Sequence, residues 1–198
     1  DFNDNDVIPM SYLSLLTLDY RDASSPTDFA DSEAMFIDHV GWGAGSRVGD
    51  IYLVTKWDES KRSGYNRLFK IPASVWPTVM DGSSTPSYSV KAVGSYNDRH
   101  GALQQQTWTG ADATYDGTLI ALGTMDANYL FLRCPGATVE EALAAPGGTT
   151  RSCLQWNSPS PGQVETISWS YDGMRTINIP EGNNGAMGWT IFVYDSTT

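Results

Sequence analysis

The strongest constraint on the fold is a pattern of short apolar segments that occurs three times along the 198-residue chain. The first copy covers 33–37, 49–54 and 66–71, the second 109–113, 115–122 and 129–132, and the third 165–169, 171–173, 176–179 and 189–194. Phe69, Phe131 and Phe192 recur along the chain 62 and 61 residues apart. This period suits a repeating sheet unit better than a helical repeat.

The segments within each copy are typical of short strands in an antiparallel sheet. They are alternating or continuous apolar runs bounded by Gly, Asp, Asn or Pro. Asp116-Gly117 and Asp172-Gly173 are predicted hairpin turns, because glycine supplies the positive φ that such turns require. In the first copy the corresponding turn is expanded to residues 39–48.

Four-stranded sheets arranged around an axis form a β-propeller, and the sequence predicts this all-β fold. Outer fourth strands are expected at 88–93 and 151–156, which gives predicted blades at about 31–96, 107–157 and 163–195. Residues 12–20 are expected to form the outer strand of a preceding blade, after an acidic segment at 1–11. Three blades do not readily close a ring, so we expect 12–198 to be a partial propeller.

One short helix is predicted near 138–145. Thr138 is a suitable N-cap residue and Glu141 follows three positions later, as in a capping box. We expect this helix to pack on the outside of the second blade.

Composition and charge restrict the class of partner. The net charge is -11, and the 12 Lys and Arg residues are scattered, whereas nucleic-acid binding needs clustered basic residues. There is no apolar run long enough to span a membrane as a helix. Scarce lysine, many aromatic residues and abundant Gly, Ser and Thr favour a secreted, extracellular protein.

The two cysteines, Cys134 and Cys153, lie in predicted neighbouring strands. A disulfide is the favoured interpretation if the compartment is oxidising. The alternative is a pair of buried free thiols in a cytosolic protein.

Antiparallel pairing of the first and second strands gathers polar residues at one mouth of the predicted central channel. They are Glu33, Thr109 and Glu165 at the starts of the inner strands, and Lys56, Thr124 and Glu181 at the ends of the second strands. Carboxylate and hydroxyl oxygens suit Ca²⁺, so Glu33 and Glu165 are candidate calcium ligands. The alternative is that these acids join the blades by accepting backbone hydrogen bonds. Asp112 falls on the opposite strand face and is predicted to stabilise a turn or to connect blades.

No catalytic residue is predicted, because zinc-ligand spacing, a nucleophile elbow and a phosphate-binding loop are all missing from the sequence. His39 and His100 are expected at the surface. The Gly-rich loop around Trp42 is expected to be packed down or to contact a partner. The other tryptophans fall mostly at strand positions, where packing between blades is favoured over sugar stacking.

Several short motifs, in this order, resemble the later blades of a family of secreted, bacterial-type β-propeller proteins. The motifs are 31–35, 49–56, 109–112 with 116–117, 136–143 and 163–167. The family is mostly of unassigned activity and lies near the six-bladed phytase-like and lactonase-like propellers. The resemblance extends from Leu13 over nearly all of the remaining chain and implies further blades on the amino-terminal side.

Two functions fit these observations. The favoured one is a non-enzymatic, secreted propeller module that forms a structural or interaction component of an extracellular assembly. Its remaining blades would come from an amino-terminal half or from another chain, and other extracellular proteins would be its partners. The alternative is a calcium-dependent, phytase-like or lactonase-like hydrolase with the ion in the channel.

Overall fold

The structure is a computed structural model, and it describes the chain in segments. These are residues 17–19, 21–22, 25–29, 31–56, 66–75, 87–89, 91–96, 107–124, 127–143, 152–159, 164–180 and 192–195. Side chains are described within 31–56, 66–75, 107–124, 128–143 and 166–179.

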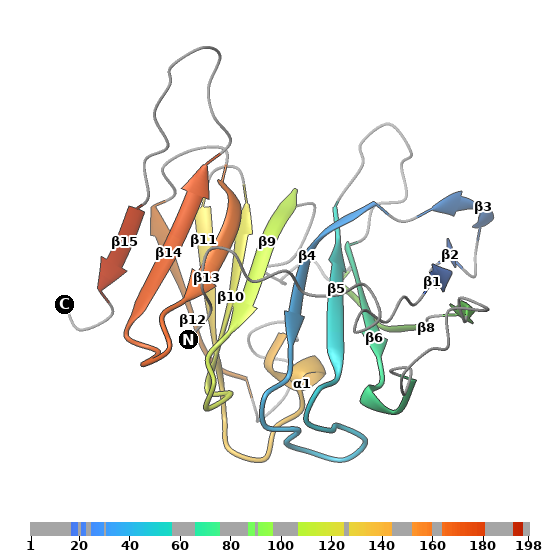
Figure 1. Cartoon of the computed structure of the whole chain (residues 1–198), viewed down its shortest axis with the longest axis horizontal. Coiled ribbons are helices and arrows are strands. Elements are labelled where there is room, and N and C mark those ends of the chain that lie inside the picture. The colour runs from blue at the N-terminus through green and yellow to red at the C-terminus, as the bar shows by residue number, and fades with distance from the viewer. Residues whose placement is uncertain are drawn as a thin grey trace, which may run out of the picture.

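Three antiparallel sheets make up most of the described structure (Figure 1). The first sheet has the order β4 (Ser32–Ile37), β5 (Ile51–Thr55), β6 (Asn66–Ile71) and β8 (Lys91–Tyr96). The second has β9 (Trp108–Ala113), β10 (Leu119–Thr124), β11 (Ala127–Arg133) and β12 (Ser152–Pro159). The third has β13 (Val164–Trp169), β14 (Arg175–Pro180) and β15 (Phe192–Asp195). The prediction of an all-β, antiparallel fold is confirmed.

Smaller elements accompany the first sheet. β1 (Thr17–Asp19) pairs in parallel with β7 (Ser87–Ser89), and β2 (Arg21–Asp22) pairs with β3 (Ser25–Phe29). A single 3-10 turn, η3 (Ala73–Val75), follows β6. The strand predicted at 88–93 is therefore divided, because β7 pairs with β1 whereas β8 pairs with β6.

The first strands of the three sheets lie side by side. β9 lies between β4 and β13, and the sheets extend outward from these strands (Figure 1). Gly110 in β9 allows the close approach, because a Cβ added there would lie 2.9 Å from the backbone nitrogen of Ile167 in β13. The inner strands of the second and third sheets therefore meet almost backbone to backbone.

Apolar side chains fill both spaces between neighbouring sheets. The core between the first and second sheets includes Ala34, Phe36, Tyr52, Val54, Leu68, Trp108, Ile120, Leu122 and Phe131. The core between the second and third sheets includes Ala121, Ile167 and Trp169, with Leu119 and Leu130 packed against it. Trp108 and Trp169 thus pack between sheets, as predicted.

The predicted short helix is α1 (Val139–Leu143), and its capping box is confirmed. The Glu141 backbone N–H donates to Thr138 Oγ1 at 3.0 Å, and the Thr138 N–H donates to Glu141 Oε2 at 2.9 Å. Val139, Ala142 and Leu143 are buried against the core between the first and second sheets. No helix among the described residues is long and apolar enough to cross a membrane.

The two predicted hairpin turns are also confirmed. Gly117 and Gly173 have φ values of 70° and 69°, in the left-handed region. In each turn a hydroxyl closes the loop: Thr114 donates to Asp116 at 2.7 Å, and Ser170 donates to Asp172 at 2.5 Å. The turn between β4 and β5 is expanded, as the sequence indicates.

Candidate functional site

The three polar residues predicted at the starts of the inner strands all lie at the same irregularity in the strand pairing. Glu33, Thr109 and Glu165 are each skipped in the pairing between first and second strand. The flanking pairs are Ser32–Thr55 and Ala34–Val54, Trp108–Thr124 and Gly110–Gly123, and Val164–Pro180 and Thr166–Ile179. Each residue is therefore the extra residue of a β-bulge, a feature that redirects side chains and is frequent near functional sites.

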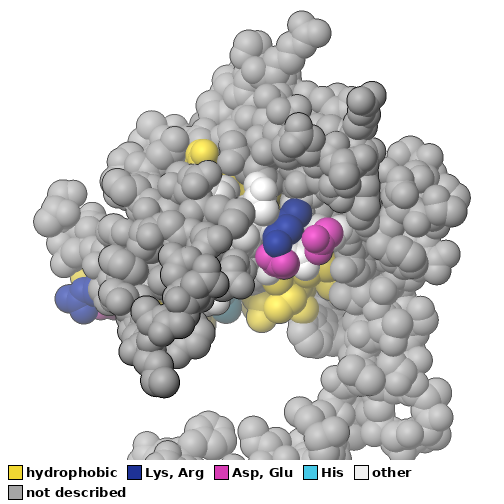
Figure 2. All heavy atoms as spheres, turned by 90° about the horizontal axis from the view of Figure 1, so that it is seen from above, with side chains coloured by type: hydrophobic (Ala, Val, Ile, Leu, Met, Phe, Trp, Pro, Cys, Tyr) yellow, Lys and Arg dark blue, Asp and Glu magenta, His cyan; other side chains and the backbone are white. Residues whose placement is uncertain are grey.

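The described side chains at this end differ from one another. Glu33 forms an ion pair with Lys56, and both side chains are partly exposed. Thr109 and Thr124 are buried, and the Thr109 hydroxyl donates to the Gly123 carbonyl at 3.4 Å. Viewed from this end, the described part of the surface shows basic and acidic side-chain atoms next to one another (Figure 2).

The calcium site at this mouth remains a prediction. Glu181 and the side chain of Glu165 lie outside the described residues. Within the described residues, no group of three His, Cys, Asp or Glu side chains could hold a metal ion. Lys56 neutralises Glu33, so a calcium ion here would have to displace that ammonium group and recruit further oxygen ligands.

A buried ion pair lies at the opposite end of the inner strands. Asp38 follows β4 and Arg133 ends β11, and their side chains are 0% and 2% exposed. Arg133 Nη1 donates to Asp38 Oδ1 at 2.8 Å, and Nη2 donates to Oδ2 at 3.1 Å. This two-point contact joins the first sheet to the second.

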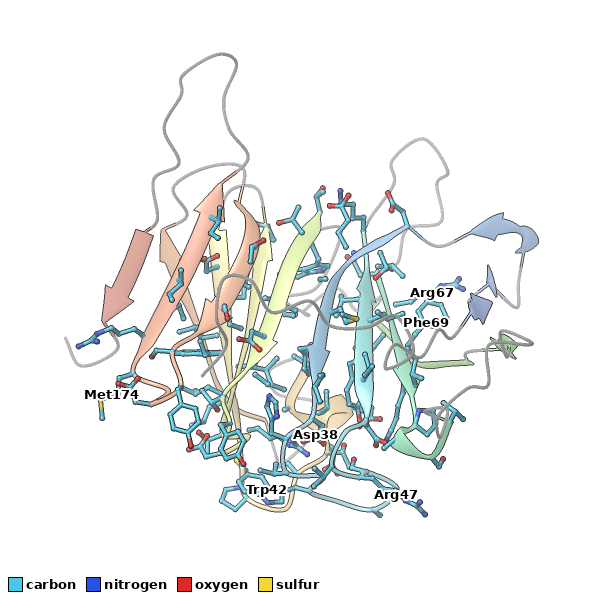
Figure 3. The ribbon with its side chains drawn as sticks, viewed as in Figure 1. Asp38, Trp42, Arg47, Arg67, Phe69 and Met174 are labelled. Atoms are coloured by element: carbon cyan, nitrogen blue, oxygen red, sulfur yellow. The ribbon has the colours of Figure 1, made fainter. Side chains whose placement is uncertain are left out.

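The same guanidinium organises the Gly-rich loop. Arg133 Nη2 donates to the Trp42 carbonyl at 3.0 Å, and Nε donates to the Ala137 carbonyl at 2.8 Å. The guanidinium carbon lies 5.5 Å from the centre of the Trp42 ring. Figure 3 shows Asp38 and Trp42 near the lower end of β4. The loop is thus packed down, one of the two expectations for it.

Hydrogen bonding keeps Asp38 ionised despite its burial. Burial alone would raise the pKa of Asp38, but hydrogen bonds from Arg133 and from the N–H groups of Gly41 and Val40 outweigh burial. The pKa of Asp38 therefore lies below its ordinary value.

A second charged cluster surrounds Lys70 of β6. Its ammonium group lies 2.7 Å from Asp50 Oδ2 and 3.9 Å from Glu140 Oε1, and it donates to the Gly45 carbonyl at 2.8 Å. It also lies 5.5 Å from the centre of the Tyr52 ring. The Tyr52 hydroxyl donates to Glu140 at 3.3 Å, and burial followed by the nearby Glu140 carboxylate raises the pKa of Tyr52. This cluster ties the loop and α1 to the first sheet.

Asp112 connects the second sheet to the third. Its Oδ2 accepts hydrogen bonds from the Trp169 backbone N–H at 2.7 Å and from the Ser168 hydroxyl at 3.0 Å. Of the two roles predicted for Asp112, stabilising a turn or connecting blades, the structure shows a connection between two sheets.

Aromatic rings from neighbouring turns contact one another at the same end of the inner strands as Asp38 and Arg133. The His39 ring lies 5.6 Å from Tyr115, and Tyr115 lies 5.8 Å from Tyr171. His39 is half-buried, and His100 lies outside the described residues.

The structure describes one of the two cysteines of the predicted disulfide in full. Cys134 follows β11 and is disulfide-bonded, and Cys153, the only other cysteine of the chain, lies in the neighbouring strand β12. The side chain of Cys153 is outside the described set, so the Cys134–Cys153 pairing stays a prediction.

Neither the family models nor the curated proteins include a match to this chain. Among solved structures it is similar to the Dos1 propeller, with a TM-score of 0.39 and 12% sequence identity. The similarity covers 83% of this chain and 31% of that one, so the chain spans less than a third of its length. This likeness assigns neither a blade number nor an activity. The phytase-like and lactonase-like family suggested by the motifs remains a prediction.

Proposed function

We propose that this chain is a non-enzymatic β-propeller module, a structural or interaction component that a further sheet completes. The supporting observation is an apolar face of the first sheet that points away from the second sheet. On β4 of this face, Met35 and Ile37 are 54% and 37% exposed. Large exposed apolar side chains on one sheet face are typical of an interaction surface.

The strand register shows what covers the equivalent face of the second and third sheets. Ile37 pairs with Ile51 in the first sheet, and Ala113 pairs with Ile120 in the second. Ile37 is therefore equivalent to Ala113. Two residues earlier, Met35 is equivalent to Ala111. Ala113 belongs to the core between the first and second sheets, and Ala111 packs against it. The equivalent residues of the third sheet, Ile167 and Trp169, are buried against the second sheet. In both cases the neighbour on this face is another sheet.

The occupant that fits Met35 and Ile37 is therefore another sheet of the same kind. In propeller terms it is the preceding blade, contributed by this polypeptide or by a partner chain. We include secretion, an extracellular assembly and the Cys134–Cys153 disulfide in this proposal, because the composition and cysteine placement favour them.

The test is the double substitution Met35→Lys and Ile37→Lys. We expect the variant to fold but to lose its association with the completing sheet, measured by analytical ultracentrifugation and cross-linking of protein from its native source. Val48→Lys is the control, because Val48 is 64% exposed but lies in the expanded loop. A wild-type protein that is monomeric, with Met35 open to hydroxyl-radical oxidation, would contradict the proposal.

A second candidate is the calcium-dependent hydrolase, favoured by the bulge shared by Glu33, Thr109 and Glu165. If calcium binds there, chelation lowers the melting temperature, because a ligand bound only by the folded state stabilises it. Calorimetric titration with calcium should then show binding that Glu33→Gln and Glu165→Gln both weaken. Unchanged melting in chelator would exclude this candidate.

A further inference from the structure

Two asparagine side chains are buried between the second and third sheets. Asn128 of β11 is 1% exposed and Asn178 of β14 is 0% exposed. Within the part of the chain that the structure describes, neither the oxygen nor the nitrogen of either carboxamide has a partner. Such groups are rare in folded proteins, because a buried amide without a hydrogen bond is costly.

Strand pairing shows that both carboxamides face the same space. Asn178 pairs with Ile167, a member of the core between the second and third sheets. Asn128 is two residues from Leu130, which packs against that core, and alternate residues of a strand share a face. The two side chains therefore approach the interface from opposite sheets.

The two residues also lie at the same level along the strands. In the second sheet, Gly110 pairs with Gly123 and Gly123 pairs with Asn128. Gly110 lies against Ile167, whose partner is Asn178. The row that contains Asn128 therefore lies opposite the row that contains Asn178.

The equivalent row between the first and second sheets is entirely apolar. Leu122 pairs with Ala111 as Asn178 pairs with Ile167, so Leu122 is the counterpart of Asn178. Val54 pairs with Leu68 in the first sheet, and Gly123 pairs with Asn128 in the second. Val54 is therefore the counterpart of Gly123, and Leu68 is the counterpart of Asn128. Leu68, Val54 and Leu122 all belong to the core between the first and second sheets.

Several equivalent positions differ between the two interfaces. Two leucines become asparagines and one valine becomes a glycine, while Ala34 is replaced by Gly110 and Ala111 by Ile167. We propose that Asn128, Asn178 and Gly123 form a site for ordered water enclosed between the second and third sheets.

Water is the ligand that matches the chemistry of the site. Each carboxamide offers both donors and an acceptor, and water both donates and accepts hydrogen bonds. Ca²⁺ takes about six to eight oxygen ligands, whereas the two neutral carboxamides supply one oxygen each, so the site suits water better than an ion. The indole nitrogen of Trp169, in the same interface, is a further buried donor that has no partner among the described residues.

The test replaces the two asparagines and the glycine by their apolar counterparts from the interface between the first and second sheets. We expect water relaxation dispersion to detect long-residence water in the wild type that is lost in the triple variant Asn128→Leu, Gly123→Val and Asn178→Leu. Asn178→Leu alone should lower the melting temperature by a few degrees, since it leaves Asn128 and the water short of a partner. The triple variant should regain much of that loss, because it leaves neither carboxamide buried without a partner.

Leu122→Asn is the matched control, because it introduces one carboxamide into the apolar row without the second asparagine or the glycine. We expect it to destabilise the protein without adding long-residence water. A high-resolution crystal structure of the wild type decides the question even if the triple variant does not fold. Electron density for water between the two carboxamides supports the site; carboxamides bonded directly to protein groups, with no water between them, would overturn it.

Discussion

At the scale of single residues, the best-defined feature is the pair formed by Asp38 and Arg133. A buried ion pair adds little net stability over an apolar pair, but removing one partner leaves an uncompensated buried charge. Here the guanidinium also holds the Trp42 and Ala137 carbonyls. Losing it would disturb the loop and the second sheet together.

The pH dependence of Asp38→Asn isolates this pair. The folded pKa of Asp38 is lowered, so its contribution is complete above the unfolded value of about 3.9 and is lost as the pH falls through the folded pKa. We expect the variant to be about 3–5 kcal/mol less stable than wild type at neutral pH. The difference should shrink below about pH 4, as Asp38 becomes protonated.

Urea unfolding across this pH range measures the difference, with Asp116→Asn as the control. Asp116 is exposed in a turn, where its pKa is lowered by hydrogen bonds from Thr114 and Thr118 that outweigh burial. A difference between wild type and Asp38→Asn that stays constant down to acid pH would contradict an ionised Asp38.

The sequence predicts residues better when their partners are local or repeated. The equivalence of Glu33 and Thr109 follows from the repeat, and the role of Asp112 follows from strand alternation. Asp38 and Arg133 were missed, because they are 95 residues apart and no local pattern links them. An arginine at the end of an apolar strand is the only signal in the sequence.

At the scale of elements, turns and helix follow from local chemistry. The Thr138 capping box and the two Asp-Gly turns form where the sequence predicts them, because their hydrogen bonds involve residues within a few positions. The parallel pairing of β1 with β7 was not predicted, since it joins segments about seventy residues apart. Pairing of that kind leaves no periodic signal.

The two hairpin glycines provide a matched pair of substitutions. Gly117→Ala and Gly173→Ala both place alanine in the left-handed region, which costs about 1–2 kcal/mol. At Gly117 the new methyl group would also overlap the Val40 side chain, whereas at Gly173 it would make only ordinary contact with Thr114. We expect Gly117→Ala to lose clearly more stability in urea unfolding. Equal losses would show that Val40 moves aside freely.

At the scale of the whole molecule, the described sheets are joined by different means. Charged side chains, the loop and α1 reinforce the apolar contact between the first and second sheets. The second and third sheets meet through a smaller apolar cluster, the close approach at Gly110 and the carboxylate of Asp112. The third sheet should therefore separate more easily than the first.

Asp112→Ala tests this difference. We expect it to cost about 1–3 kcal/mol, because the Trp169 N–H and the Ser168 hydroxyl lose their acceptor. Hydrogen exchange followed by mass spectrometry should show faster exchange in 164–180, with little change in 31–56. Asp116→Ala serves as the control, since Asp116 bonds only within its own turn in the described contacts. Faster exchange throughout the chain would mean that the sheets open as one unit.

The bulges on the inner strands have a consequence for how such a protein can change over time. A residue that is extra to the pairing can be exchanged for another without shifting the strands on either side. Acid, hydroxyl and acid already occupy this place in successive sheets. The side chains at one end of the molecule can therefore change, one sheet at a time, while the scaffold that carries them stays the same.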